Sequence, residues 1–182
     1  KDVMEGIEAA KKYGLTPIKI NTVLVKGFND DEIEALAGLT EKEEIDIRFI
    51  ELMPIGVTAK AELDGYISND IVLEKLPELI EVEREDISSP AVYYRLPKGK
   101  GKIGLINPVS CKFCKYCNRI RLTARGSLKL CLHSNKEINL KEALRSGQDI
   151  EKLIIDAIDK KPESHHLEDG EYISKKMYEI GG

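Results

Sequence analysis

The sequence lacks any long apolar run, and this absence excludes one class of protein. Hydrophobic residues make up 42% of the 182 positions, but charged residues, at 33%, interrupt them throughout. No stretch approaches the roughly 18 consecutive apolar residues that a membrane span needs. The N-terminus also has no basic segment followed by an apolar one, so nothing indicates secretion. We therefore expect a cytoplasmic globular protein that does not associate with membranes.

The chain also lacks an excess of positive charge. Lys and Arg total 28 against 32 Asp and Glu, which gives a formal net charge of −4. A general nucleic-acid binder is normally basic, so we expect no nucleic-acid partner. Any anion site must then be a local cluster of cations. Internal repeats and low-complexity segments are absent too, and the length allows one domain or two small ones.

Helix and strand patterns alternate in the opening third of the chain. A capping box at the N-terminus predicts a helix that Gly14 ends. Residues 17–25 and 44–56 have strand patterns, and an acidic-started helix is expected between them from about Asn29. Strand, helix and strand at this spacing predict a parallel βαβ unit. This part of the chain is therefore expected to belong to a barrel or an open α/β sheet.

Alternation in the first predicted strand places Ile18 and Ile20 on one face and Lys19 and Asn21 on the other. If helices cover the aliphatic face, Lys19 points into the barrel and implies an anionic ligand there. The other interpretation is a lysine at an exposed strand end. Met53 lies near the end of the second predicted strand, together with Glu51, where methionine is more often a core residue than a ligand contact.

The middle of the chain changes its pattern. A helix is expected from Ser68 until Pro77 ends it. Alternation with period two then predicts four strands, the last two joined by a turn at Arg125 and Gly126, where glycine can take positive φ. These predicted strands cover residues 91–97, 102–110, 118–124 and 127–133.

The last part of the chain is predicted to be helical and then polar. Capping residues predict helices over 139–147 and 148–162. The polar segment that follows contains His165 and His166, which we expect to be exposed to solvent.

All four cysteines lie between Cys111 and Cys131, unlike a disulfide framework spread over the whole chain. Cys114 and Cys117 are separated by two residues, and Cys131 returns on the far arm of the predicted hairpin, so these three thiols can close on one metal centre. Cys111 adds a further spacing of two. From spacing alone, an iron–sulfur cluster and a structural zinc site, with four thiolates or with three and His133, are about equally favoured.

Two arginines follow the cysteines. In a strand, Arg119 and Arg121 point to one face while Asn118 and Ile120 point to the other. One interpretation is a solvated edge strand. The other is a bidentate clamp for phosphate or carboxylate, which an arginine pair forms better than lysine does. A metal centre with a phosphate clamp beside it would constitute a substrate site.

Five segments together resemble the radical S-adenosylmethionine GTP 3',8-cyclase family of molybdenum cofactor biosynthesis. They are PIKINTVLVKGFNDDEI, IRFIELMPIG, INPVS, FCKYCNRIRLTARGSLKLCL and the terminal GG. The resemblance implies an α/β fold in which residues 1–60 form the closing βα units of an incomplete (βα) TIM-like barrel. Residues 61–182 would then form a small α+β region that carries a [4Fe–4S] site and a Gly–Gly tail.

The resemblance also implies the roles of particular residues. Three thiolates would hold the GTP-side [4Fe–4S] cluster, whose open iron binds GTP: Cys114, Cys117 and Cys131. Four residues would bind GTP: Lys19, Arg119, Ile120 and Arg121. Met53 falls on a position that contacts S-adenosylmethionine. The last two residues match a tail that enters the active site: Gly181 and Gly182.

The implied activity is that of a lyase-class enzyme that converts GTP to a cyclised 8-dihydro-GTP, for which cyclic pyranopterin synthase acts downstream. It needs S-adenosylmethionine and a second [4Fe–4S] cluster, held by three cysteines at spacings that this sequence lacks. The chain also opens without an initiator methionine. We therefore expect a C-terminal half that is inactive without its N-terminal half, and the resemblance leaves a homodimer open.

Cys111 departs from the family pattern, and it is either a fourth ligand or a bystander. The alternatives to the cyclase are a zinc-stabilised nucleic-acid-binding module and a ferredoxin-like electron carrier that uses all four cysteines.

Overall fold

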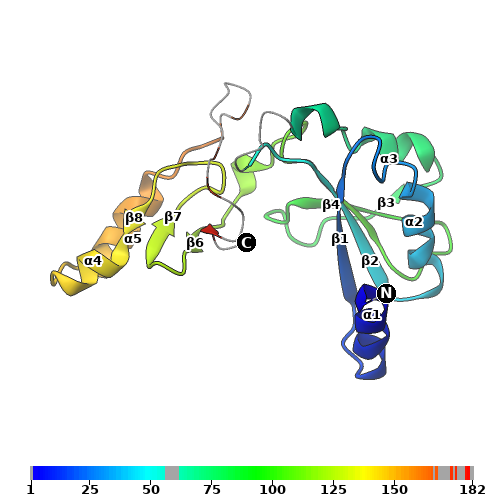
Figure 1. The fold of residues 1–182 in the computed structure, drawn as a ribbon, viewed down its shortest axis with the longest axis horizontal. Coiled ribbons are helices and arrows are strands. Elements are labelled where there is room, and N and C mark those ends of the chain that lie inside the picture. The colour runs from blue at the N-terminus through cyan, green and yellow to red at the C-terminus, as the bar shows by residue number, and fades with distance from the viewer. Residues whose placement is uncertain are drawn as a thin grey trace. The chain divides into compact units, whose positions relative to one another are not determined.

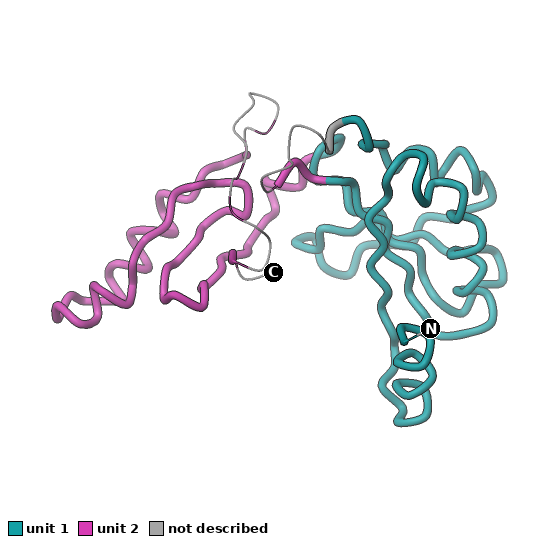
Figure 2. The backbone as a smooth tube through the Cα atoms, viewed as in Figure 1, with its two compact units in different colours: residues 1–52, 64–111 teal, residues 53–63, 112–182 magenta. Residues whose placement is uncertain are grey.

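The computed structural model describes residues 2–55, 62–165, 167, 173, 175, 179 and 180. It consists of two compact units, one formed by residues 1–52 and 64–111 and the other by residues 53–63 and 112–182 (Figure 2). Both contain helices and strands, so the predicted α/β class is confirmed (Figure 1). Within the described residues, no helix has the length and apolar character needed to cross a membrane.

The first unit is built on a five-stranded mixed sheet with the order β1-β2-β5-β4-β3 (Figure 1). β1 pairs with β2, and β2 with β5, in parallel, whereas β4 pairs with β5 and with β3 in antiparallel fashion. The strands are β1 (Ile18–Leu24), β2 (Ile45–Glu51), β3 (Ile80–Glu81), β4 (Ala91–Arg95) and β5 (Ile103–Ile106). The predicted parallel βαβ unit is therefore correct, and two of the predicted period-two strands extend the same sheet.

Three α-helices belong to this unit: α1 (Asp2–Lys12), α2 (Ile33–Lys42) and α3 (Asp70–Lys75). A short 3-10 helix, η1 (Glu62–Gly65), has its first two residues in the other unit and its last two in this one. The prediction that a helix starts near Asn29 was wrong. The Asn29 side chain instead closes a turn, because its Oδ1 accepts from the backbone N–H of Val25 at 2.9 Å and its Nδ2 donates to the carbonyl of Val23 at 2.9 Å. The predicted stop at Pro77 is confirmed.

β2 lies between β1 and β5, and both β2 and β5 are mostly buried. β1 exposes alternate residues, among them Lys19, while Leu24 at its end is completely buried. This alternation confirms the predicted two faces of β1. The core contains Leu24, Ile33, Ala37, Ile45, Ile47, Phe49, Val72, Leu76, Leu96, Ile103 and Leu105.

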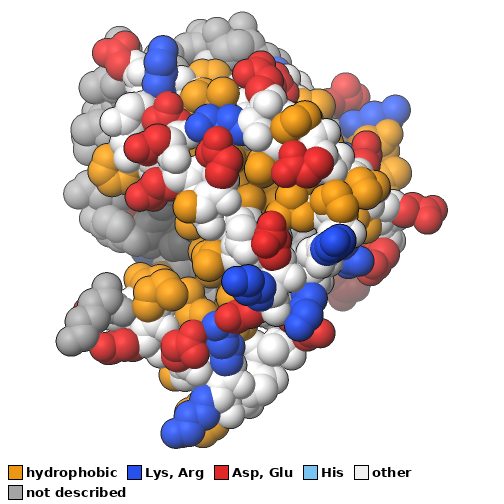
Figure 3. Space-filling model, turned by 90° about the vertical axis from the view of Figure 1, so that its right-hand side faces the viewer, with side chains coloured by type: hydrophobic (Ala, Val, Ile, Leu, Met, Phe, Trp, Pro, Cys, Tyr) orange, Lys and Arg blue, Asp and Glu red, His pale blue; other side chains and the backbone are white. Residues whose placement is uncertain are grey.

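The surface mixes charged and apolar side chains. On the face drawn in Figure 3, acidic and basic side chains are interspersed among hydrophobic ones. α1 has no buried residue, and Val3 and Tyr13 are 72% and 75% exposed. The core of the first unit is therefore formed mainly by the sheet, α2 and α3.

The second unit contains a three-stranded antiparallel sheet with the order β6-β7-β8. Its elements are η2 (Cys114–Tyr116), β6 (Arg121–Leu122), β7 (Ser127–Lys129), β8 (Ile138–Asn139), α4 (Leu140–Arg145) and α5 (Ile150–Asp159). Gly126 has a φ of 83° in the turn between β6 and β7, which confirms the predicted hairpin. Asn139 and Asp149 accept from backbone N–H groups at the starts of α4 and α5, which confirms both predicted helices.

A small apolar cluster connects distant parts of the second unit. Ile173 and Ile180 are completely buried, and Ile55 is 9% exposed. Met53 and Leu132 pack against these three isoleucines. Ile55 and Ile173 also form a parallel bridge between their backbones. The segment after β2, the segment after β7 and residues near the end of the chain therefore meet in one place.

Candidate metal centre

Three of the four cysteines lie in two loops of the second unit. Cys114 and Cys117 flank the single turn of η2, where the backbone N–H of Cys117 donates to the carbonyl of Cys114 at 3.0 Å. Cys131 lies two residues after the end of β7. All three are partly buried, whereas Cys111 is exposed, and all four cysteines are free of disulfide bonds.

The three partly buried thiols influence one another electrostatically. Burial raises the pKa of Cys131, and the negative charges of Cys114 and Cys117 raise it further. Burial also acts to raise the pKa of Cys117, but the backbone N–H of Arg119 and the charge of Lys161 outweigh it, so this pKa is lowered. The repulsion that helps to raise the pKa of Cys131 fits a bound metal, because a cation would relieve it.

The donor set suits either a thiolate-ligated iron–sulfur cluster or zinc. Among the residues that the structure describes, no three Cys, His, Asp or Glu side chains already stand at the spacing of a metal site. The assignment of Cys114, Cys117 and Cys131 as ligands therefore stays a prediction that agrees with their chemistry.

Lys161 is a contact residue of this site that sequence reasoning missed. Its Nζ donates to the carbonyl of Cys117 at 2.5 Å and to that of Arg119 at 3.0 Å, and it lies 3.6 Å from the sulfur of Cys117. Lys161 stands next to Lys160 and Pro162 at the end of a predicted helix. Nothing in that pattern separates it from a solvated lysine.

Comparison with known proteins now bears on this site. Residues 45–167 match the family model described as Molybdenum Cofactor Synthesis C. This match covers the three thiols, both arginines and Lys161. The chain belongs to the Molybdenum Cofactor Synthesis C family.

Three relatives of the chain are each named GTP 3',8-cyclase. It is 58% identical to a GTP 3',8-cyclase of Peptoclostridium acidaminophilum over 99% of this chain and 56% of that protein. It is 50% identical to a GTP 3',8-cyclase of Clostridium botulinum, over 99% of this chain and 57% of that protein. A GTP 3',8-cyclase of Pelotomaculum thermopropionicum is 42% identical over 98% of this chain and 57% of its own length. The chain thus spans little more than half the length of these relatives.

The arginine segment of this family member differs from the predicted strand. β6 contains only Arg121 and Leu122, so Arg119 and Ile120 lie outside it and the predicted alternation over 118–124 was wrong. The reason is that Lys161 and the thiol of Cys117 engage the backbone of Arg119 in place of a neighbouring strand. Arg119 and Ile120 are exposed, and Arg121 is partly buried opposite Lys129 of β7.

Met53 contacts a histidine in the second unit of this family member. His133 Nε2 lies 3.1 Å from Met53 Sδ, and the rings of His133 and His165 meet edge to face at 4.6 Å between centroids. Burial lowers the pKa of His133 to about 4, with smaller contributions from His165, Lys129 and Arg121. The expectation that His165 is exposed was wrong, because only 5% of it is accessible.

The predicted site residues are divided between the two units. Lys19 is exposed on β1 and belongs to the first unit, whereas the thiols, both arginines and Met53 belong to the second. Gly181, Gly182 and His166 lie outside the described residues. The structure therefore brings together in one unit the thiols, the arginine segment and Met53.

Two buried polar residues at the carboxyl ends of β2 and β5 also escaped sequence reasoning. Glu51 is completely buried and accepts from the backbone N–H groups of Val109 and Ser110, both at 2.9 Å, and from the hydroxyl groups of Ser110 and Tyr66. Asn69 is also completely buried, and its Nδ2 donates to the carbonyl groups of both strands at 3.1 Å. These contacts fix the segment that leads to Cys111.

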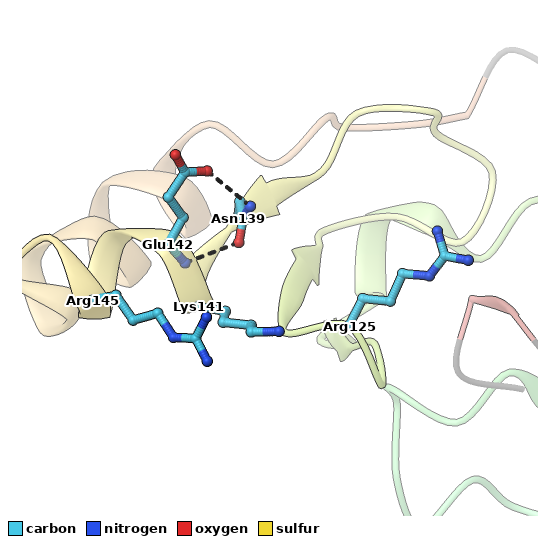
Figure 4. Close-up of a pocket in the computed structure, with 5 residues that line it drawn as sticks. All are labelled: Arg125, Asn139, Lys141, Glu142 and Arg145. Carbon is cyan, nitrogen blue, oxygen red and sulfur yellow. Dashed lines mark hydrogen bonds between the residues drawn. The ribbon is translucent and has the colours of Figure 1, made fainter.

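A shallow pocket elsewhere in the second unit carries cations as well. Its lining comes from the hairpin turn and α4: Arg125, Asn139, Lys141, Glu142 and Arg145 (Figure 4). All five residues are exposed. The Asn139 side chain caps α4 and also donates to the Glu142 carboxylate at 3.1 Å (dashed in Figure 4). No cysteine lines this pocket, so it is separate from the candidate metal centre.

Proposed function

We propose that this chain is the substrate-side half of a GTP 3',8-cyclase, a lyase-class enzyme of molybdenum cofactor biosynthesis. Its relatives of that name match 98–99% of the chain. The observation that carries the proposal is the segment from Cys117 to Arg121. It contains one candidate metal ligand and two guanidinium groups, and the Arg119 backbone N–H donates to the Cys117 thiol. The candidate metal ligand and the two arginines therefore lie in one short segment, and a hydrogen bond connects the ligand to the first arginine.

In this proposal, Cys114, Cys117 and Cys131 would hold a [4Fe–4S] cluster through three thiolates. Such a cluster would supply a Lewis-acidic iron for GTP, and S-adenosylmethionine with a second [4Fe–4S] cluster in the N-terminal half would supply the radical chemistry. Arg119 and Arg121 hold the triphosphate by charge-assisted hydrogen bonds, since guanidinium groups match phosphate oxygens.

Residues outside this segment have roles in the proposal as well. Lys19 neutralises part of the GTP charge from β1, Ile120 contacts the nucleotide, and Met53 contacts S-adenosylmethionine. Residues 1–60 close an incomplete (βα) barrel, and 61–182 form the α+β region. The Gly181 and Gly182 tail has no side chains and is suited to passing backbone through the narrow active site.

The identity of the metal tests the first part of the proposal. Protein prepared and reconstituted under anaerobic conditions should bind iron and sulfide and show the visible absorption of an iron–sulfur cluster. Cys114→Ala should abolish it, while Cys111→Ala should leave it intact. A colourless protein that holds zinc would support the zinc-stabilised module instead. Equal loss in both variants would support a four-cysteine electron carrier.

The arginine clamp is tested by nucleotide binding and turnover. Arg119→Ala and Arg121→Ala should each weaken GTP use by roughly ten- to a hundredfold, because each removes a charge-assisted contact of about 1.5–3 kcal/mol. Turnover is measured after the chain is joined to the N-terminal half of the Peptoclostridium acidaminophilum relative. Arg125→Ala is the matched control, since Arg125 is an exposed arginine of the same hairpin. Loss of iron in the Arg119 or Arg121 variant would indicate a structural role instead.

A further inference from the structure

Lys161 is fixed at its backbone by the end of α5. The helix ends at Asp159, Lys160 is its C-terminal cap, and the backbone N–H of Lys161 donates to the carbonyl of Ile158 at 3.0 Å. Lys160 is exposed, whereas Lys161 is partly buried. Two neighbouring lysines therefore have different surroundings, and only the second is directed at the candidate metal centre.

The ammonium group of Lys161 has three acceptors around it. They are the carbonyl of Cys117 at 2.5 Å, the carbonyl of Arg119 at 3.0 Å and the sulfur of Cys117 at 3.6 Å. A lysine ammonium has three N–H donors and no acceptor, so this set matches its hydrogen-bonding capacity. Lys161 connects the end of α5 to a loop 44 positions earlier in the chain.

These contacts have a geometric consequence. Arg119 lies outside β6, so no strand pairing holds its backbone. The Lys161 ammonium and the Cys117 thiol are the groups that the structure shows engaging that backbone. The direction in which the Arg119 side chain leaves the loop is thus set partly by Lys161.

The contacts also have an electrostatic consequence. A cation and an N–H donor beside a cluster sulfur favour the more negative, reduced form of the cluster. Methionine at this position would keep much of the length and remove both effects. Arginine would keep the charge and the donors.

We propose that Lys161 is a positioning residue of this site, which fixes the segment from Cys117 to Arg119 and raises the reduction potential of the bound cluster. This inference rests on the proposed function, because it assumes an iron–sulfur cluster on Cys117. Lys161 touches neither GTP nor S-adenosylmethionine in this proposal. It acts through a metal ligand and a phosphate-binding residue.

The experiment compares the reconstituted chain with its Lys161→Met, Lys161→Arg and Lys160→Met variants. Iron content, the midpoint potential of the cluster and GTP affinity are measured for each. Lys161→Met should shift the one-electron reduction equilibrium about tenfold toward the oxidised form, which corresponds to about 59 mV toward more negative potential. It should also weaken GTP binding severalfold. Lys161→Arg should restore both values, and Lys160→Met should change neither.

The outcomes separate the two proposals. A wild-type chain without an iron–sulfur cluster would remove the proposed function and this inference with it. A wild-type chain with a cluster, and a Lys161→Met variant with full iron content and unchanged potential and affinity, would overturn the inference alone. If Lys161→Met fails to hold iron, the Lys161→Arg variant decides the question. A normal cluster in Lys161→Arg supports the positioning role, and loss of the cluster in Lys161→Arg contradicts that role.

Discussion

Buried charged and polar side chains are the most informative single residues of this chain. Glu51 has no exposed surface, yet four donor groups from Val109, Ser110 and Tyr66 surround its carboxylate. Burial, and then the negative charge of Glu51, raise the pKa of Tyr66. The carboxylate therefore holds the loop after β5 in place of backbone pairing.

We expect Glu51→Gln to destabilise the first unit by about 1–2 kcal/mol. The amide oxygen can still accept from the two backbone N–H groups, but it is a weaker acceptor than a carboxylate, and the NH₂ group then faces the Ser110 and Tyr66 hydroxyl groups, which must reverse their hydrogen bonds. Unfolding by urea, followed by circular dichroism, measures this change. Glu44→Gln is the control, since Glu44 is exposed just before the same strand. Equal stability of the two variants would show that the Glu51 carboxylate is not needed for the loop.

Single residues also show where sequence reasoning ends. Cys114, Cys117 and Cys131 could be predicted as a group, because ligand spacing along the chain is a local property. Lys161 and Glu51 could not, since each acquires its role from partners 44 and 58 positions away. His133 was a candidate zinc ligand from spacing, but its contact with Met53, 80 positions away, was not predictable. A lysine near a helix end or a glutamate in a strand has the same local pattern whether or not such partners exist.

At the scale of elements, the hairpin of β6 and β7 depends on one glycine. Gly126 has positive φ, and its carbonyl accepts from the backbone N–H of Lys141 at 3.0 Å. A Cβ atom at Gly126 would lie 2.7 Å from the Cβ of Lys141, closer than such atoms pack. The turn between β6 and β7 therefore packs closely against the first turn of α4.

Gly126→Ala and Gly147→Ala separate the cost of a left-handed backbone conformation from the cost of the clash with Lys141. Gly147 also has positive φ, at 75°, but a Cβ there would meet nothing within 4 Å. We expect Gly147→Ala to cost about 1–2 kcal/mol for the left-handed conformation alone. Gly126→Ala should cost clearly more, because Lys141 must move as well. Thermal unfolding of both variants measures the difference, and a smaller loss at Gly126 would contradict the close approach.

The elements were predictable to different degrees for a physical reason. The helices α1, α4 and α5 and the strands β1 and β2 carry periodic patterns and local caps, so their positions followed from the sequence. β3 and β8, with two residues each, carry no pattern of their own. β6 was predicted too long, because tertiary contacts of Lys161 replace strand pairing at Arg119. The same contacts create the candidate site.

At the scale of the whole molecule, the two units differ in what stabilises them. The first unit has eleven buried residues in one apolar cluster, while the second has a cluster of three, as far as the described residues show. A smaller core leaves more of the stability to other interactions, and metal ligation is the usual supplement in small domains.

We therefore expect removal of the proposed metal to affect the units unequally. Treatment with a chelator under reducing conditions should increase amide hydrogen exchange in the second unit, especially in β7 and around Cys131. Exchange in β1 and β2 should stay slow, because their core contains no cysteine. Mass spectrometry of exchanged peptides measures both regions in one sample. A uniform increase over both units would show that the metal stabilises the chain as a single cooperative structure.

The bridge between Ile55 and Ile173 has a consequence for the order of events during synthesis. Its partners lie far apart in sequence, so the pairing closes a long loop and cannot form until Ile173 has left the ribosome. The three candidate ligands, Cys114, Cys117 and Cys131, precede Ile173 and have left the ribosome by then. The thiols thus become available to bind metal while Met53 still lacks the packing of Ile173 and Ile180. In the proposed site, metal binding should therefore precede the pairing of Ile173 with Ile55.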